Sequence, residues 1–186
     1  MQDFYAGGKR LMYAIIKCSD LDIDRLVDFY NDAVKYLDEH INYPKWKYGL
    51  YPARESISTA VAAGTQYACL ENGEILGAFV LNDDPQGAYE KGEWSVSLDP
   101  GEFLVVHTLA TAPKDYGKGV AKFIIEYCIQ TARDEGYKAI RLDIVPGNIP
   151  AQKLYERLGF KCAGEKDLLR DFDDIPSFIL YEYNIN

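Results

Sequence analysis

Residues 103–121 read FLVVHTLATAPKDYGKGVA and combine three structural signals. The apolar, β-branched beginning predicts a buried strand over residues 102–110. Gly117 and Gly119 follow, at the start of a helix predicted over residues 118–135. Such a helix start offers unpaired N–H groups and a partial positive charge, which together attract anions. The stretch therefore predicts an anion-binding loop between a strand and a long helix.

Two nucleotide-binding motifs are alternatives for this stretch, and both fail on spacing. A P-loop needs Gly-x-x-x-x-Gly-Lys-Ser/Thr, but Ala112 occupies the position of the first glycine and Gly119 that of the Ser/Thr. The Rossmann fingerprint needs a glycine at the position that Lys122 occupies. A plain helix start with two turn glycines remains open from this stretch alone.

The rest of the chain predicts a mixed α/β domain with the element order β-α-α-β-β-β-α-β-α-β-β. Asn72-Gly73 between two apolar runs is a strong hairpin signal. We expect an N-terminal extension over residues 1–11, with flexibility at Gly7-Gly8, and one domain over residues 12–186. The remaining strands are predicted at 12–17, 66–70, 75–81, 139–145, 160–163 and 178–183, and the remaining helices at 23–41, 52–63 and 150–158.

Composition excludes several broad classes of protein. The 186 residues are 48% hydrophobic and 26% charged, which is typical of a globular chain and not of a disordered one. We find no apolar run near the roughly 18 residues of a spanning helix and no signal peptide. We therefore expect a cytoplasmic protein whose cysteines are reduced and mostly buried; these are Cys18, Cys69, Cys128 and Cys162.

The charge balance bears on the partners of the protein. The net charge of −9 comes from 29 acidic and 20 basic residues, which argues against nucleic acid as a partner. It suits a cationic small substrate, although it also serves solubility. The acidic residues between 20 and 39 are interpreted as a solvated helix face. With only two histidines, His40 and His107, no metal site is expected.

A second motif, NIPAQKLYERLGF, follows the glycine loop at residues 148–160. Together they resemble the GNAT superfamily of acyl-CoA N-acyltransferases. In that family Arg/Gln-x-x-Gly-x-Gly/Ala begins a helix, and Asn-x-x-Ala-x-x-Leu-Tyr-x-x-x-Gly-Phe follows later. The clear likeness covers residues 102–163, with one departure: Tyr116 stands where the family has Arg or Gln. The resemblance implies a GNAT fold, a mixed and mostly antiparallel sheet that is splayed centrally and flanked by helices.

The resemblance also implies the residues that bind acetyl-CoA, with no metal involved. The loop backbone would bind the pyrophosphate, and Lys118 or Lys122 could add a charge. The strand end would bind the pantetheine arm through its main chain, and ordinary strand core is the alternative for its apolar side chains. Asn148 would contact the CoA arm or cap the short helix after it. The loop residues are Tyr116, Gly117, Lys118, Gly119, Val120 and Ala121, and the strand residues are Leu109, Ala110 and Thr111.

Two side chains are candidates for catalysis. By the resemblance, Tyr155 would protonate the departing thiolate, with a place in the core as the alternative. His107 would deprotonate the amine, because strand alternation places it on the same face as Leu109. A buried, hydrogen-bonded histidine is the alternative for His107, and Glu102 is a weaker candidate base. The Leu109 N–H would donate to the thioester oxygen.

The resemblance implies transfer of an acetyl group from acetyl-CoA to a primary amine of a small molecule, by direct attack in a ternary complex. An acyl-CoA-binding module without turnover is one alternative. Acetylation of protein N-termini or lysines is another. We expect a small-molecule amine as the partner, with neither nucleic acid nor membrane, and a homodimer stays open.

Overall fold

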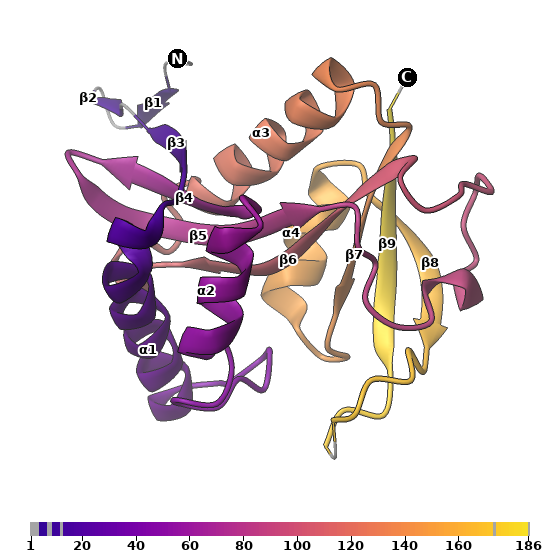
Figure 1. Ribbon diagram of the computed structural model, residues 1–186, viewed down its shortest axis with the longest axis horizontal. Helices are drawn as coiled ribbons and strands as arrows, with labels where there is room; N and C mark the ends of the chain where they lie inside the picture. Colours follow the sequence, from indigo (N-terminus) through magenta and orange to yellow (C-terminus); the bar gives the residue numbers. More distant parts are fainter. Residues whose placement is uncertain (1–3, 7–8, 12, 173, 186) are drawn as a thin grey trace. The chain divides into compact units, whose positions relative to one another are not determined.

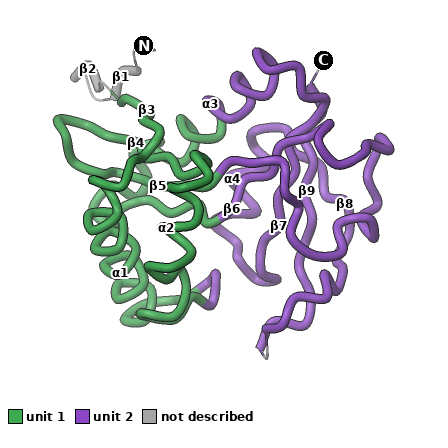
Figure 2. The backbone as a smooth tube through the Cα atoms, viewed as in Figure 1, with its two compact units in different colours: residues 1–42, 46–80, 108–125 green, residues 43–45, 81–107, 126–186 purple. Residues whose placement is uncertain are grey.

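The computed structural model describes residues 4–6, 9–11, 13–172 and 174–185. The chain divides into two compact units (Figure 2). Unit 1 contains residues 1–42, 46–80 and 108–125, and unit 2 contains residues 43–45, 81–107 and 126–186. Gly7-Gly8, where flexibility is predicted, lies outside the described residues. The domain boundaries given above, 1–11 and 12–186, stay a prediction.

The helices and strands follow the predicted order from the third strand onward (Figure 1). The Asn72-Gly73 hairpin is confirmed, because both residues have positive φ angles, 52° and 82°, as a type I′ turn requires. The strands are β1 Phe4–Ala6, β2 Lys9–Leu11, β3 Ala14–Lys17, β4 Gln66–Glu71, β5 Glu74–Asn82, β6 Phe103–Thr111, β7 Ala139–Ile144, β8 Lys161–Lys166 and β9 Phe178–Asn184. The α-helices are α1 Ile23–Glu39, α2 Arg54–Ala62, α3 Val120–Asp134 and α4 Ile149–Arg157.

The N-terminal extension contains two strands that the sequence analysis missed. Strands β1 and β2 pair antiparallel, with Phe4 opposite Leu11. Each has only three residues, which is too short to show the alternation that identifies a half-buried strand.

Seven strands form one sheet in the order β3-β4-β5-β6-β7-β9-β8. Strands β6 and β7 pair parallel, whereas β3–β4, β4–β5, β7–β9 and β8–β9 pair antiparallel. The expected mixed, mostly antiparallel sheet is confirmed. The parallel register runs from Phe103↔Ala139 to Val105↔Arg141, while β6 itself continues to Thr111. The last part of β6 therefore extends past its parallel ladder with β7.

In unit 1, helices pack on both faces of β5. Helices α1 and α2 contact each other, and they enclose a core whose buried members include Leu26, Tyr30 and Ala78. The neighbouring Gly77 points to the other face, since successive strand residues alternate. A Cβ atom there would lie 2.7 Å from the Ile124 side chain and 3.0 Å from the Ala110 carbonyl oxygen. The first turns of α3 thus lie close to β5 at Gly77, and a larger residue there would require the Ile124 side chain to shift.

Unit 2 has its own core and a buried ion pair. Its buried residues include Phe103, Val105 and Leu180. The Arg141 guanidinium lies 2.9 Å from Glu182 Oε1, and both side chains are 3% exposed. The guanidinium also lies over the rings of Trp94 and Phe103, at 4.1 and 4.2 Å. This cluster joins β7, β9 and the loop before β6.

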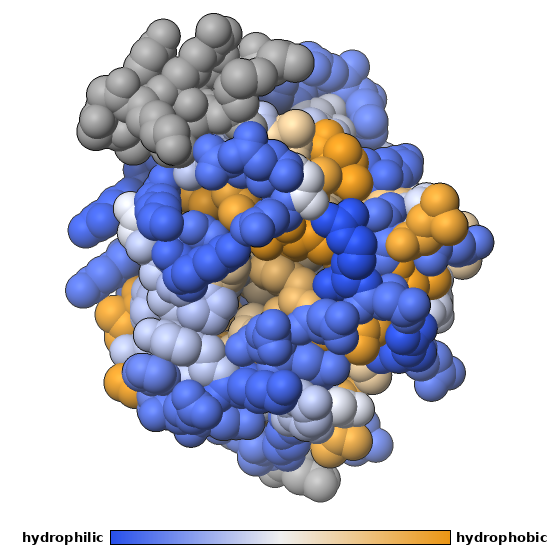
Figure 3. Space-filling model, turned by 90° about the vertical axis from the view of Figure 1, so that its left-hand side faces the viewer, coloured by the Kyte–Doolittle hydropathy of each residue, from blue (hydrophilic) through white to orange (hydrophobic). Residues whose placement is uncertain are grey.

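The surface and the thiols agree with the expected globular character. The face drawn in Figure 3 is largely hydrophilic, with hydrophobic side chains gathered in smaller patches. Among the residues that the structure describes, no helix has both the length and the hydropathy to cross a membrane. Cys18, Cys69 and Cys128 are buried free thiols, as expected, and Cys162 is exposed.

Candidate active site

The glycine loop of unit 1 exposes backbone N–H groups in front of α3. Gly117 and Gly119 have φ angles of +77° and +86°, which other L-residues adopt only under strain. A Cβ atom at either glycine would meet nothing within 4 Å. The Phe123 N–H donates to the Gly119 carbonyl, so the amides of Val120 and Ala121 precede the helical hydrogen-bond ladder. The glycines are therefore required for backbone conformation, and the space beside them is open.

Side chains around this loop hold it in place. The Lys118 ammonium lies 2.8 Å from Asp115 Oδ1, and the Asp115 side chain is 9% exposed. The Tyr13 hydroxyl donates to the Lys118 carbonyl. Tyr116 packs edge-on against Tyr36 of α1, with the ring centroids 5.6 Å apart. In this position an aromatic ring anchors the loop to α1, and the Lys118 charge is directed to Asp115.

One residue of β6 has a left-handed backbone, just before the predicted CoA-binding strand residues. Thr108 has a φ angle of +47°, which is left-handed and unusual for a β-branched residue. Its carbonyl accepts a hydrogen bond of 3.0 Å from the Tyr30 hydroxyl. Leu109, Ala110 and Thr111 follow Thr108 in the strand. The Ala110 side chain is part of the unit 1 core, so the side chain has a structural role.

His107, the last residue of β6 within unit 2, has a defined hydrogen-bond pattern. Its Nε2 lies 3.1 Å from Asn82 Oδ1 and 2.9 Å from the Asp84 carbonyl oxygen. The Asn82 Oδ1 also accepts the Asp84 N–H, which fixes it as an acceptor. Both partners of Nε2 are acceptors, so Nε2 carries the proton and Nδ1 of the neutral ring keeps its lone pair.

A partly buried polar cluster centred on Asp143 influences the pKa of this histidine. Asp143 of β7 accepts two hydrogen bonds from Arg170, at 2.8 and 2.9 Å, and one from the Tyr89 hydroxyl, at 2.6 Å. Burial lowers the pKa of His107 below 6.5; the Arg170 charge acts in the same direction, while Asp143 and Asp84 oppose it. His107 is therefore neutral at pH 7 and able to accept a proton.

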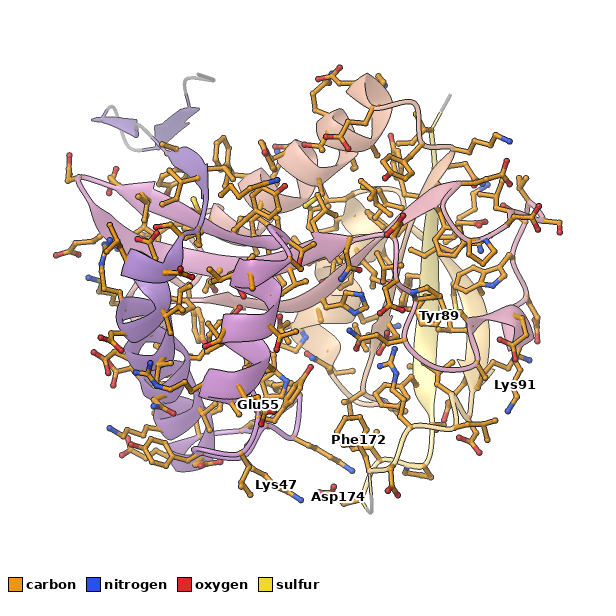
Figure 4. All side chains as sticks on the ribbon, in the orientation of Figure 1. Lys47, Glu55, Tyr89, Lys91, Phe172 and Asp174 are labelled. Atoms are coloured by element: carbon orange, nitrogen blue, oxygen red, sulfur yellow. The ribbon has the colours of Figure 1, made fainter. Side chains whose placement is uncertain are left out.

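The sequence analysis missed the three residues that form this cluster. Tyr89 (Figure 4) lies in a short 3₁₀ helix at residues 89–91, and its ring packs in the unit 2 core. Asp143 is on a strand and Arg170 in a loop, separated by 27 residues. No motif connects them. The acidic residue at position 143, inside a strand that is mostly apolar, is a signal that could have drawn attention to the site.

Tyr155 lies on α4, and it is 6% exposed. Its ring centroid is 5.5 Å from that of Phe160 and 6.2 Å from that of Tyr181. Burial raises the pKa of Tyr155 well above 10, and the nearby Cys128 and Asp143 raise it further. The phenol keeps its proton at pH 7. It belongs to an aromatic cluster, and Asp143 influences both this hydroxyl and His107.

The two remaining candidates have clear structural roles. The Asn148 side chain caps α4, because its Oδ1 accepts the Ala151 N–H at 3.3 Å. Glu102 forms an ion pair with Lys138, and the hydrogen bond from Lys138 lowers the pKa of Glu102. A weaker base suits proton abstraction less, so His107 is the better candidate. Unit 1 therefore holds Leu109–Thr111 and the glycine loop, and unit 2 holds His107, Asn148 and Tyr155.

The sequence matches the acetyltransferase (GNAT) family over residues 23–160, so the chain belongs to this family. Among curated proteins it is similar to human N-acetyltransferase 8B, at 41% identity over 49 residues, which is 26% of this chain and 22% of that protein. The rat N-acetyltransferase 8B is 27% identical over 106 residues, 55% of this chain and 42% of that one. The matches thus span less than half of these curated relatives.

Solved structures share the fold. A GNAT-family acetyltransferase from Streptococcus agalactiae has a TM-score of 0.76 at 20% identity, with 98% of each chain covered. A GNAT-family acetyltransferase from Listeria monocytogenes has a TM-score of 0.74 at 18% identity, covering 98% of this chain and 99% of that chain. An acetyltransferase from Salmonella typhimurium, solved with its cofactor acetyl-CoA, has a TM-score of 0.65 at 16% identity and covers 94% of each chain. The GNAT fold predicted from the two motifs is confirmed.

Proposed function

We propose that the protein transfers an acetyl group from acetyl-CoA to a primary amine of a small molecule. The observation that carries the proposal is the loop with Gly117 and Gly119, which leaves open space beside left-handed glycines at the start of α3. Amides at a helix start bind a pyrophosphate through hydrogen bonds and the helix dipole. An acetyl-CoA-bound structure with this fold supports the choice of co-substrate.

The end of β6 would bind the rest of the co-substrate through its main chain. An extended ligand arm adds to exposed strand backbone as a further strand would. Leu109, Ala110 and Thr111 would supply these groups, and the Leu109 N–H would donate to the thioester oxygen. That oxygen gains negative charge as the amine attacks, so a donor directed at it lowers the barrier.

His107 would act as the base. An alkylammonium with a pKa of about 10 must lose a proton first, which costs on the order of 4 kcal/mol at pH 7. The lone pair on Nδ1 would take up a proton of the attacking amine, directly or through water. The hydrogen bonds from Nε2–H to Asn82 and Asp84 hold the tautomer that makes Nδ1 basic.

Tyr155 would act as the acid. Nucleophilic attack forms the carbon–nitrogen bond, and collapse of the intermediate breaks the carbon–sulfur bond. The phenol would donate its proton to the departing sulfur and recover one from solvent, so that one amine proton leaves and one thiol proton is gained. The high pKa of the buried phenol keeps it in the donating form.

The test is release of free thiol from acetyl-CoA with a panel of primary amines. We expect thiol release that depends on the amine, together with the acetylated product. Matched tertiary amines, which cannot form the amide, serve as the control. Peptides with free N-termini test the protein-substrate alternative. CoA binding in calorimetry without thiol release from any amine would establish the binding-module alternative instead.

A further inference from the structure

We propose that Tyr30 of α1 is a positioning residue for acyl transfer: its hydroxyl fixes the Thr108–Leu109 peptide group and so directs the Leu109 N–H. This inference rests on the proposed function, in which that N–H stabilises the thioester oxygen. Nothing in the two sequence motifs includes Tyr30, which lies 78 residues before Thr108.

A single peptide plane connects the Tyr30 hydrogen bond to the proposed donor. The Thr108 carbonyl and the Leu109 N–H belong to one planar, trans peptide group, so they point in opposite directions. The Tyr30 hydroxyl donates to that carbonyl at 3.0 Å. Anchoring the oxygen at one end therefore sets the direction of the N–H at the other end.

The peptide group needs such an anchor because the backbone beside it is strained. Thr108 has a φ angle of +47°, and a non-glycine residue keeps this conformation only when its surroundings hold it there. This positive φ angle also departs from regular strand geometry, in which φ is negative. A hydrogen bond to the carbonyl further polarises the peptide group, which strengthens its N–H as a donor.

Tyr30 itself is held rigidly. Its side chain is 1% exposed, and its ring packs edge-on against Phe29 and Trp46, with centroids 5.4 and 6.0 Å apart. The hydroxyl also interacts with Gln66, which is 1% exposed and whose Nε2 donates to the Phe79 carbonyl. Every one of these contacts lies within unit 1. The hydrogen bond from the Tyr30 hydroxyl thus links α1 to the Thr108 carbonyl from a well-fixed side chain.

The decisive variant is Tyr30→Phe, which removes the hydroxyl and keeps the ring packing. One oxyanion donor contributes about 10²–10³ in kcat. Because the variant misdirects the donor without deleting it, we expect kcat to fall about tenfold. The Kd for CoA should stay within about twofold, because CoA carries no thioester oxygen. The KM for acetyl-CoA should also stay within about twofold, because the oxygen gains its negative charge only during attack.

Ile57→Val is the matched control. Ile57 is a 2% exposed member of the same core as Tyr30, and its trimming loosens that core without removing the hydrogen bond. We expect it to retain the wild-type kcat. An equal loss of kcat in Ile57→Val, an unchanged kcat in Tyr30→Phe, or a parallel loss of CoA affinity would each overturn the inference.

A double variant tests how the Tyr30 hydrogen bond acts. Glycine adopts a positive φ without strain, so Thr108→Gly should make the anchor less necessary. We expect the Tyr30→Phe/Thr108→Gly protein to have at least threefold higher kcat than Tyr30→Phe alone, and the absence of rescue would contradict the inference. If Tyr30→Phe does not fold, the kcat of Thr108→Gly is compared with that of the double variant. We expect the two values to agree within threefold, and a larger difference would overturn the inference.

Turnover by the wild-type protein distinguishes failure of the proposed function from failure of the inference about Tyr30. Without amine-dependent thiol release in the wild type, the proposed function fails and the inference fails with it. With wild-type turnover and an unaffected Tyr30→Phe, the inference alone fails.

Discussion

The glycine loop of unit 1 is built from main-chain groups, whereas the His107 cluster of unit 2 is built from side chains. The loop offers main-chain N–H groups, and its glycines contribute only their freedom to adopt positive φ angles. The cluster depends on side chains from three separate segments, which meet at Asp143. A loop that acts through its backbone depends on residue spacing, whereas a cluster of side chains depends on tertiary packing.

This difference predicts which substitutions affect binding and which affect turnover. Changes in the loop should weaken CoA binding, because they alter the backbone or fill the open space. Changes at the titratable side chains should lower kcat while CoA binding is kept. Thr108 begins the last segment of unit 1. It belongs to the main-chain category, since the role proposed for it depends on a peptide group.

The largest expected effect is on CoA affinity, in Gly119→Asp. The new side chain strains a residue at a φ angle of +86° and places a carboxylate in the open space beside it. We expect the Kd for CoA to rise at least about 100-fold, which is about 2.7 kcal/mol. Calorimetry measures the affinity, and circular dichroism confirms that the variant is folded.

Gly136→Asp is the matched control for this variant. Gly136 follows the other end of α3 with a φ angle of +82° and equally open space. It reproduces the backbone strain without a carboxylate at the loop, so CoA affinity should stay at the wild-type value. Unchanged affinity in a folded Gly119→Asp protein would remove the loop from the CoA site.

The main-chain features of the fold were the ones that the sequence predicted well. Left-handed glycines at positions 117 and 119, the Asn72-Gly73 turn and the apolar run of β6 each require particular residue types at a fixed spacing. The element order followed from these local signals. The cap formed by Asn148 was one of the two roles considered for this residue, the other being a contact to the CoA arm.

The parts that escaped prediction depend on contacts between distant residues. In the periodic pattern of α1, Tyr30 looks like one more buried residue, and only the structure pairs its hydroxyl with the Thr108 carbonyl. Arg170 lies in a loop without any periodicity, yet it completes the environment of Asp143. Hydrophobic period and turn chemistry carry no information about such partners.

The second prediction concerns turnover, in Tyr155→Phe. Acid catalysis typically contributes about 10²–10⁴, but a thiolate leaves well unassisted, so we expect a loss of about ten- to a thousand-fold in kcat. The Kd for CoA should stay near the wild-type value, because the ring keeps its packing against Phe160 and Tyr181.

Tyr183→Phe is the control for the acid. Its ring packs against Phe160 in the same aromatic cluster, 5.3 Å between centroids, and it has no proposed catalytic role. We expect its kcat to be normal. If Tyr155→Phe retains the wild-type kcat while chemistry limits the rate, the role of Tyr155 is packing alone.

The third and smallest effect on rate is expected in His107→Gln, about tenfold at pH 7, since water can replace the base in part. The pH dependence is the sharper measurement. In the wild type, kcat/KM for an alkylamine should fall on the acid side at an apparent pKa below 6.5, because burial lowers the pKa of His107. His107→Gln should lack this limb. His40→Gln, at the exposed C-terminal cap of α1, should keep it.

The same lowered pKa links His107 to stability with a defined sign. Between the folded pKa and about 6.5, the unfolded chain binds more protons than the folded chain, so the free energy of unfolding falls as the pH falls through this window. Above about 6.5 this contribution is fully present. The difference in Tm between wild type and His107→Gln should therefore change across that window and stay constant above it. Wild-type kcat/KM and Tm profiles in His107→Gln would instead place the base elsewhere and leave His107 as a hydrogen-bonding partner of Asn82 and Asp84.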